Sequence, residues 1–145
     1  ICHILPTSIM SKKSTIKLLN IACQSALKIP LDIEKDKFAI LSDQHFGDGT
    51  QESDDFLVNK SIYISALNFY FKNNFTLIEV GDVEELWECD FEKIIRVYSD
   101  IYILEKKFFD SGRLYRIFGN HDIFWKNEKY LKKFLPEYTV YESIL

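Results

Sequence analysis

Residues 75–82 read FTLIEVGD, a largely apolar and β-branched run that is followed at once by Gly-Asp. Such a run predicts a buried strand that ends in a turn. Residues 38–43, FAILSD, and residues 114–120, LYRIFGN, have the same arrangement. The same local pattern, an apolar strand that stops at a short polar cluster, thus appears three times along the chain.

Segments of helical periodicity separate these strands. We expect a first helix that is capped by Ser14 or Thr15, packs Cys23 on an apolar face and ends before Pro30. Further helices are expected from residues 53–55 to Asn73-Asn74, from Asp90 toward Gly112, and over about 125–134, with a fourth strand at 138–145.

Alternation of strands and helices predicts an α/β fold with a mostly parallel sheet and right-handed crossovers. The near-continuous apolar character of the strands indicates burial on both faces of that sheet. We divide the chain into an N-terminal extension with one helix, residues 1–36, and a main domain, residues 37–145.

Composition excludes several classes of protein. The 145 residues carry a net charge of −4 and no basic patch, which does not favour binding to nucleic acids. No apolar run reaches the roughly 18 residues of a transmembrane helix. The three cysteines are far apart, which indicates reduced thiols and a cytoplasmic protein rather than a disulfide framework.

Polar side chains at the three strand ends form the candidate site. In open α/β sheets, ligands bind at the carboxyl ends of the strands, so Asp43, His45, Asp82 and Asn120 should converge. Asp43 and His45 are two residues apart, and an extended strand end would point both the same way. Oxygen and imidazole ligands suit Mn, Fe or Zn. Two such ions could generate a hydroxide and clamp a phosphoryl group.

Two neighbours of Asn120 are candidates for catalysis. His121 could stabilise the transition state or protonate the leaving oxygen, and Asp122 could orient its imidazole through a hydrogen bond. Turn chemistry is the competing explanation, because Asp, Asn and Gly all favour turns, but it does not require His45 or His121. Asp48 and Asp54-Asp55 are expected to be turn and capping acids.

The ordered set Asp43-Gln44-His45, Gly81-Asp82 and Gly119-Asn120-His121-Asp122 resembles the first three signature motifs of the calcineurin-like metallophosphoesterases. The resemblance covers roughly residues 37–125. It implies the N-terminal half of a two-sheet β-sandwich flanked by helices. It also implies that Asp43, His45 and Asp82 hold a first divalent ion, that Asp82 and Asn120 hold a second, and that His121 is the catalytic histidine.

The family completes its two-metal site with a later His and a Gly-His-x-His segment, whereas this chain has three His and none after His121. We therefore expect a fragment that binds metal weakly and turns over slowly or not at all.

Residues 82–87, DVEELW, are similar to the UDP-diacylglucosamine pyrophosphohydrolase branch of this family. Glu85 and Trp87 could form a wall on the substrate side of the metals, or Trp87 could pack at the start of a helix.

The expected function is metal-dependent hydrolysis of a phosphate mono- or diester or a pyrophosphate bond through a hydroxide that bridges two metals. The substrate would be a phosphorylated small molecule or a phosphoprotein. The alternative is a non-catalytic scaffold for protein interactions built on the same fold, and the intact Asn120-His121 pair favours the enzyme. A nuclease of the same family is disfavoured by the acidic balance.

Overall fold

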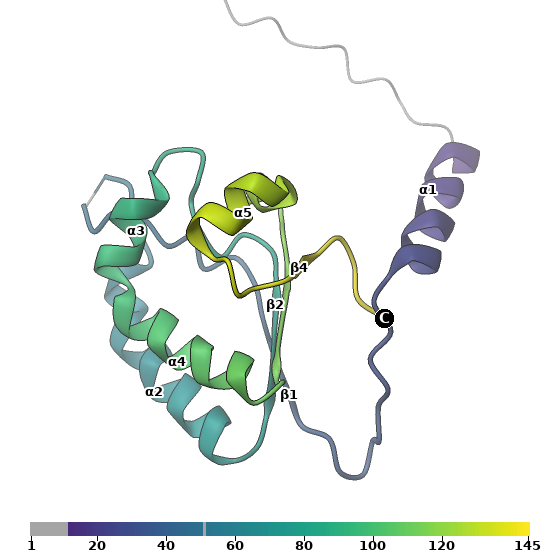
Figure 1. The fold of residues 1–145 in the computed structure, drawn as a ribbon, viewed down its shortest axis with the longest axis horizontal. Helices are drawn as coiled ribbons and strands as arrows, with labels where there is room; N and C mark the ends of the chain where they lie inside the picture. Colours follow the sequence, from purple (N-terminus) through teal and green to yellow (C-terminus); the bar gives the residue numbers. More distant parts are fainter. Residues whose placement is uncertain (1–11, 51) are drawn as a thin grey trace, which may run out of the picture.

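The protein is described by a computed structural model that covers residues 12–50 and 52–145 (Figure 1). Its elements, in chain order, are α1 (Lys12–Ser25), β1 (Phe38–Leu41), η1 (Leu57–Asn59), α2 (Lys60–Lys72), β2 (Thr76–Val80), α3 (Phe91–Val97), α4 (Ser99–Asp110), β3 (Leu114–Ile117), η2 (Ile123–Lys126), α5 (Glu128–Phe134) and β4 (Val140–Tyr141), where η marks a 3₁₀ helix.

The four strands form one sheet in the order β1-β2-β3-β4, and every neighbouring pair is parallel. The α/β class and the parallel sheet are therefore confirmed. Phe38 pairs with Thr76 and Leu77 pairs with Leu114, so the first three strands run side by side and end at the same edge. The loops that follow them carry the candidate site residues.

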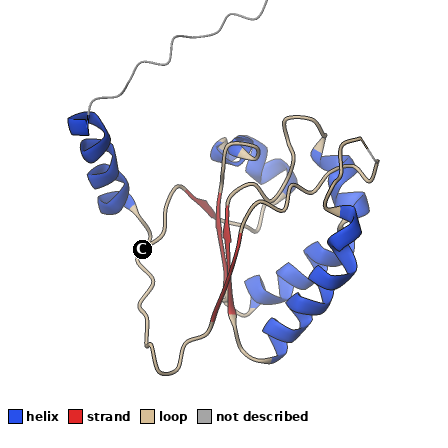
Figure 2. Ribbon diagram, turned by 180° about the vertical axis from the view of Figure 1, so that it is seen from behind, coloured by secondary structure: helices blue, strands red, loops and turns tan. Residues whose placement is uncertain are grey.

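Helices cover only one face of this sheet. Figures 1 and 2 show α2, α3 and α4 against one side, while α1 stands apart on the other side. Leu77 is buried toward the helices, whereas Ile40 is 64% exposed and Val80 is 43% exposed. The prediction that the strands are buried on both faces is thus wrong for the described residues, because no element covers the second face.

Several predicted element boundaries were wrong, and the helix expected over about 125–134 is divided into η2 and α5. Asp54 does precede a helical segment, but α2 itself begins at Lys60, after the short η1. The long third helix is broken at Tyr98 into α3 and α4. The hydroxyl of Tyr98 donates to Asp54 Oδ1 at 2.5 Å, so a buried contact fixes the break. The fourth strand is limited to β4.

The N-terminal helix α1 is more solvent-exposed than expected. Ser14 and Thr15 lie inside it rather than before it, and Cys23 is exposed, so the predicted packing of this thiol is wrong. Leu27 forms a parallel bridge with Ile144, which ties the segment after α1 to the last residues. Cys2 and His3 lie outside the described residues.

A charged cluster lies inside the core between the sheet and the helices. Arg116 of β3 is 2% exposed, and Glu79, Glu84 and Glu105 are fully buried. The guanidinium lies 2.6 Å from Glu79 Oε2 through Nε and 2.8 Å from Glu84 Oε1 through Nη2. Apart from the neighbouring carboxyl of Glu79, the Glu105 carboxyl has no hydrogen-bond partner among the described residues. Three buried acids thus surround one buried base.

Glu84 is the best satisfied of the three acids. Besides Arg116, it accepts hydrogen bonds from the Tyr102 hydroxyl at 2.7 Å and from Trp125 Nε1 at 2.9 Å. Glu84 lies in the loop after β2, so these bonds attach that loop to α4, to β3 and to η2.

Across the described residues, no helix has the length and the apolar character needed to cross a membrane.

Candidate metal centre

The loops after β1 and β2 stay paired beyond the ends of their strands. The backbone N–H of Asp43 donates to Gly81 O at 3.2 Å, and that of His45 donates to Asp82 O at 3.0 Å. Phe46 and Glu84 then form a parallel bridge, with hydrogen bonds of 2.8 and 3.0 Å on either side of Glu84. The buried ring of Phe46 stacks on Tyr98 at 4.4 Å. The first loop is thereby fixed to both the second loop and the core.

Three of the predicted ligands have left-handed backbone conformations. The φ angles are 57° at Asp43, 50° at His45 and 55° at Asp82. Asn74 is the one other described non-glycine residue with positive φ, and it ends α2 as predicted. The expected extended geometry at Asp43 and His45 is therefore wrong. The left-handed turns at Asp43 and His45, rather than an extended strand end, place the two side chains on the same side.

Two glycines allow the loops after β2 and β3 to touch. A Cβ atom on Gly119 would lie 2.2 Å from Asp82 Oδ1, and one on Gly81 would lie 2.8 Å from Gly119 Cα. Gly81 also has a φ of 75°, which disfavours any side chain. Asp82 can therefore approach the loop that carries His121 only if both positions are glycine.

Asp43, His45 and Asp82 meet as the topology predicted. Their ligand atoms all lie within 4.8 Å of one another. His45 Nε2 is 3.9 Å from Asp43 Oδ1, which is longer than a hydrogen bond. Asp82 Oδ1 accepts a hydrogen bond from the backbone N–H of His121 at 2.7 Å, which orients this carboxylate. Two carboxylates and one imidazole nitrogen thus face a common point.

Glu85 contacts both site histidines, a role that the sequence did not reveal. Its Oε2 lies 3.0 Å from His45 Nδ1 and 2.6 Å from His121 Nδ1. Both are hydrogen-bond distances, and a carboxylate oxygen can only accept, so each imidazole presents an Nδ1–H to Glu85. In a neutral imidazole that carries this proton, Nε2 keeps its lone pair, and His45 Nε2 is the atom next to Asp43.

Asp122 has a different role from the one predicted. Its Oδ1 accepts from the backbone N–H of Gly119 at 2.5 Å and its Oδ2 accepts from that of Val83 at 2.9 Å. It therefore joins the loops after β2 and β3, and Glu85 takes the orienting role expected of it. Burial, followed by the charge of Glu84, raises the pKa of Asp122 above its ordinary value.

Asn120 lies at the edge of the cluster. It is exposed, between Gly119 and His121. Within the described part of the chain, its side chain forms no hydrogen bond with the other predicted ligands. The second metal position that was expected at Asp82 and Asn120 therefore stays a prediction.

Trp87 lies beside the site and is 60% exposed, so the expectation that it packs at a helix start is wrong. Its indole stacks on the imidazole of His121, with ring centres 4.1 Å apart and planes 25° apart. The His121 ring in turn meets His45 edge-on at 4.4 Å.

A pocket of about 350 Å³ opens beside the cluster. His45 and Glu85 form part of its wall, and the rest is formed by Glu52, Ser53, Asp55 and Glu88. Four carboxylates in one small pocket make a strongly negative environment, which attracts cations and repels phosphate groups.

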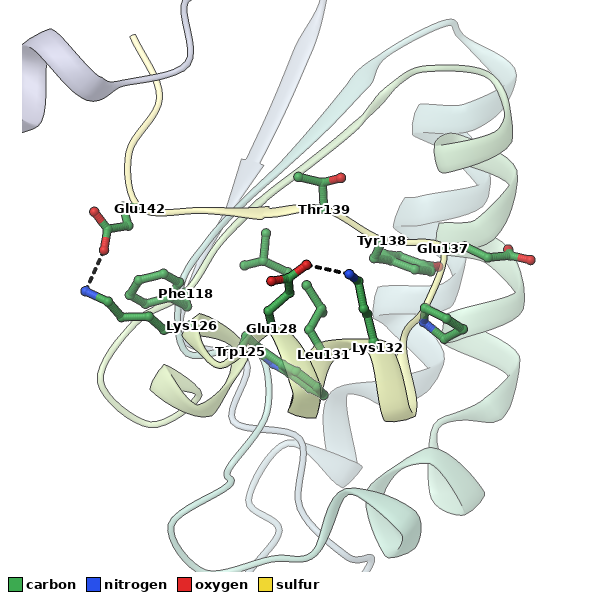
Figure 3. A pocket seen from close by; sticks show the side chains of 12 residues that line it. Phe118, Trp125, Lys126, Glu128, Leu131, Lys132, Glu137, Tyr138, Thr139 and Glu142 are labelled. Carbon is green, nitrogen blue, oxygen red and sulfur yellow. Dashed lines mark hydrogen bonds and ion pairs between the residues drawn. The ribbon is translucent and has the colours of Figure 1, made fainter.

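A larger pocket lies elsewhere. It has a volume of about 570 Å³ and lies between α5 and the segment around β4, with Phe118, Trp125 and Tyr138 among its walls (Figure 3). Lys126 pairs with Glu142 at its rim, at 2.5 Å. None of the candidate metal ligands lines it.

Asp48 and Asp54 act in turns, as expected. Asp48 Oδ1 accepts from Thr50 and Ser53, and Asp54 accepts from the backbone of Gly49 and Leu57.

Comparison of the chain with models of protein families, with curated proteins and with solved structures found no match.

Proposed function

We propose that the chain carries the site of a metal-dependent phosphohydrolase of the calcineurin-like metallophosphoesterase superfamily. The reaction is hydrolysis of a phosphate mono- or diester or of a pyrophosphate bond, on a phosphorylated small molecule or a phosphoprotein. The observation that carries the proposal is the meeting of Asp43, His45 and Asp82, with ligand atoms within 4.8 Å, at the carboxyl ends of two neighbouring parallel strands.

The donor set fits a divalent cation. Two carboxylates and one imidazole nitrogen suit Mn²⁺, Fe²⁺ or Zn²⁺. The hydrogen bond from His45 Nδ1 to Glu85 is the usual outer-shell support for a histidine that binds metal through Nε2. Bound divalent cations would supply an activated hydroxide and offset the charge of the phosphoryl group. The proposed second ion would use Asp82 and Asn120.

The chain's own residues position the remaining groups. Asp82 is oriented by the backbone of His121, so the ligand and the catalytic candidate are mechanically coupled. Glu85 holds His121 by Nδ1 and leaves Nε2 as the nitrogen that can face a phosphoryl or leaving oxygen. There it can stabilise developing charge or hold the proton that the leaving oxygen takes.

The acidic pocket requires that cations bind before a phosphate ester can. With Glu52, Asp55, Glu85 and Glu88 around it, a phosphate ester would meet repulsion at this edge unless cations were bound first. Removal of metal should therefore weaken substrate binding as well as turnover.

Two measurements test the proposal. Titration of the chain with Mn²⁺ in a calorimeter should show binding that Asp82→Asn weakens by more than about tenfold. Asp110→Asn, at an exposed acid of α4 that pairs with Lys106, is the matched control and should bind as the wild type does. The full-length protein should hydrolyse p-nitrophenyl phosphate, its bis ester or pyrophosphate at a rate that requires Mn²⁺ and stops with EDTA.

The outcomes separate the alternatives. Equal Mn²⁺ binding by the wild type and Asp82→Asn would contradict the metal site. Asp82-dependent binding without hydrolysis of any of the three substrates would contradict the enzyme and favour the scaffold.

A further inference from the structure

Trp87 occupies a place that core packing does not explain. Of the two tryptophans, Trp125 is 2% exposed and Trp87 is 60% exposed. An indole is among the largest apolar groups, and burying it is one of the stronger stabilising contributions available to a fold. Trp87 forgoes most of that burial, so its position calls for another reason.

Its ring lies over His121. The ring centres are 4.1 Å apart and the planes are nearly parallel, at 25°. The backbone N–H of Trp87 also donates to Glu85 Oε1 at 3.3 Å, while Glu85 Oε2 holds His121 Nδ1. Trp87 therefore contacts both His121 and the carboxylate that binds it.

The two contacts restrain different motions of the imidazole. The last side-chain torsion of histidine is broad and roughly two-fold, so an imidazole that is 26% exposed, as that of His121 is, can rock and flip. The hydrogen bond to Glu85 fixes one edge of the ring but allows it to swing out of plane. A ring stacked on its face opposes that swing. His45, which meets His121 edge-on at 4.4 Å, limits the ring from another side.

We infer that Trp87 is a positioning residue that holds the His121 imidazole in the plane in which Glu85 meets Nδ1 and Nε2 stays free. The catalytic meaning of this role rests on the proposed function. The structural role does not, because it concerns the orientation of one ring.

Nuclear magnetic resonance of the imidazoles tests the orientation directly. In the wild type, the carbon-bound protons of His121 should be shifted upfield by the indole ring current, and its ring nitrogens should show a single tautomer with the proton on Nδ1. Trp87→Leu should abolish the upfield shift and average the two tautomers. Trp87→Phe should keep both features in part. Phe69→Leu, at an exposed aromatic residue of α2, is the control.

A His121 ring that keeps the single tautomer with its proton on Nδ1 in Trp87→Leu would overturn the inference. Because Trp87 is largely exposed, both variants should keep the far-ultraviolet circular dichroism of the wild type.

Kinetics of the full-length protein with Mn²⁺ give the second readout. Trp87→Leu should lower kcat about 3- to 10-fold at unchanged KM, as expected for loss of one aromatic contact, and Trp87→Phe should restore most of the rate. A raised KM at unchanged kcat would overturn the inference, since Trp87 would then bind substrate rather than position His121. If the wild type shows no metal-dependent hydrolysis, the proposed function fails, and the resonance measurements still decide the role of Trp87.

Discussion

Replacement of Glu105 by glutamine should remove a large part of the pH dependence of stability. Glu105, Glu79 and Glu84 surround the single guanidinium of Arg116, and all four side chains are buried. Burial, followed by the charge of Glu79, raises the pKa of Glu105 well above its ordinary value. The pKa of Glu79 is raised as well, by burial, although Arg116 opposes the rise. At a pH between the unfolded and the folded pKa values, the folded core therefore retains a proton that the unfolded chain has released.

The retained proton determines whether stability rises or falls with pH. A carboxyl with a raised folded-state pKa contributes its full stability below the unfolded pKa, about 4.3 for Glu, and loses it as the pH rises toward the folded value. For one proton, the free energy of unfolding falls by about 1.4 kcal/mol per pH unit in this range. The loss builds up between the unfolded pKa and the raised folded pKa, so the free energy of unfolding of the wild type should fall as the pH rises above 5.

Glu105→Gln keeps the shape of the side chain and removes its titration. Urea denaturation followed by circular dichroism at pH 5, 6, 7 and 8 should give a shallower slope for this variant, and a higher stability than the wild type at pH 7. Glu137→Gln, at an exposed acid that pairs with Lys106, should leave the slope unchanged. Equal slopes for the wild type and Glu105→Gln would refute the assignment of the retained proton to this cluster.

Three further outcomes follow from the site. Gly119→Ala places a Cβ atom 2.2 Å from Asp82 Oδ1, which should displace this carboxylate. Calorimetry should therefore show Mn²⁺ binding that is weaker by about tenfold or more. Binding equal to that of the wild type would contradict the packing of these loops. Glu85→Gln should lower Mn²⁺ affinity about 10- to 100-fold, whereas Glu88→Gln on the same pocket should have a smaller effect. Asp43→Gly should raise the free energy of unfolding, measured in urea, by about 1 kcal/mol, because glycine adopts the φ of 57° without strain. The same substitution should weaken Mn²⁺ binding, because it removes a carboxylate ligand. A lower free energy of unfolding would contradict the strain at Asp43.

The parallel order of the strands was predictable, and it brought Asp43 and Asp82 together. Apolar runs that stop at polar clusters identify strand ends, and a parallel sheet brings such ends to one edge. The local backbone was not predictable from the residue types. Asp and His occur in both extended and left-handed conformations, so the sequence did not show that φ is positive at Asp43 and His45.

Contacts between distant residues explain most of the remaining errors. Glu85 meets His45 from 40 positions away and His121 from 36, and no periodic pattern encodes that meeting. The break between α3 and α4 contains no proline or glycine. It depends on the buried hydroxyl of Tyr98, which bonds Asp54 from 44 positions away.

The exposed sheet face shows another limit of sequence patterns. Ile40 and Ile78 belong to apolar runs that indicate burial, and a run of this kind cannot show whether a covering element is present. Ile40 is 64% exposed in the structure.

The left-handed residues Asp43, His45 and Asp82 also bear on how this chain could change in evolution. Each occupies a conformation that glycine adopts more easily, but Asp82 and His45 also make hydrogen bonds that glycine would lose, so a gain in stability is expected at Asp43. Selection for folding alone would therefore favour glycine in place of Asp43. Under the proposed function, metal binding would oppose this substitution, and a lineage that no longer binds metal should show glycine at position 43 early.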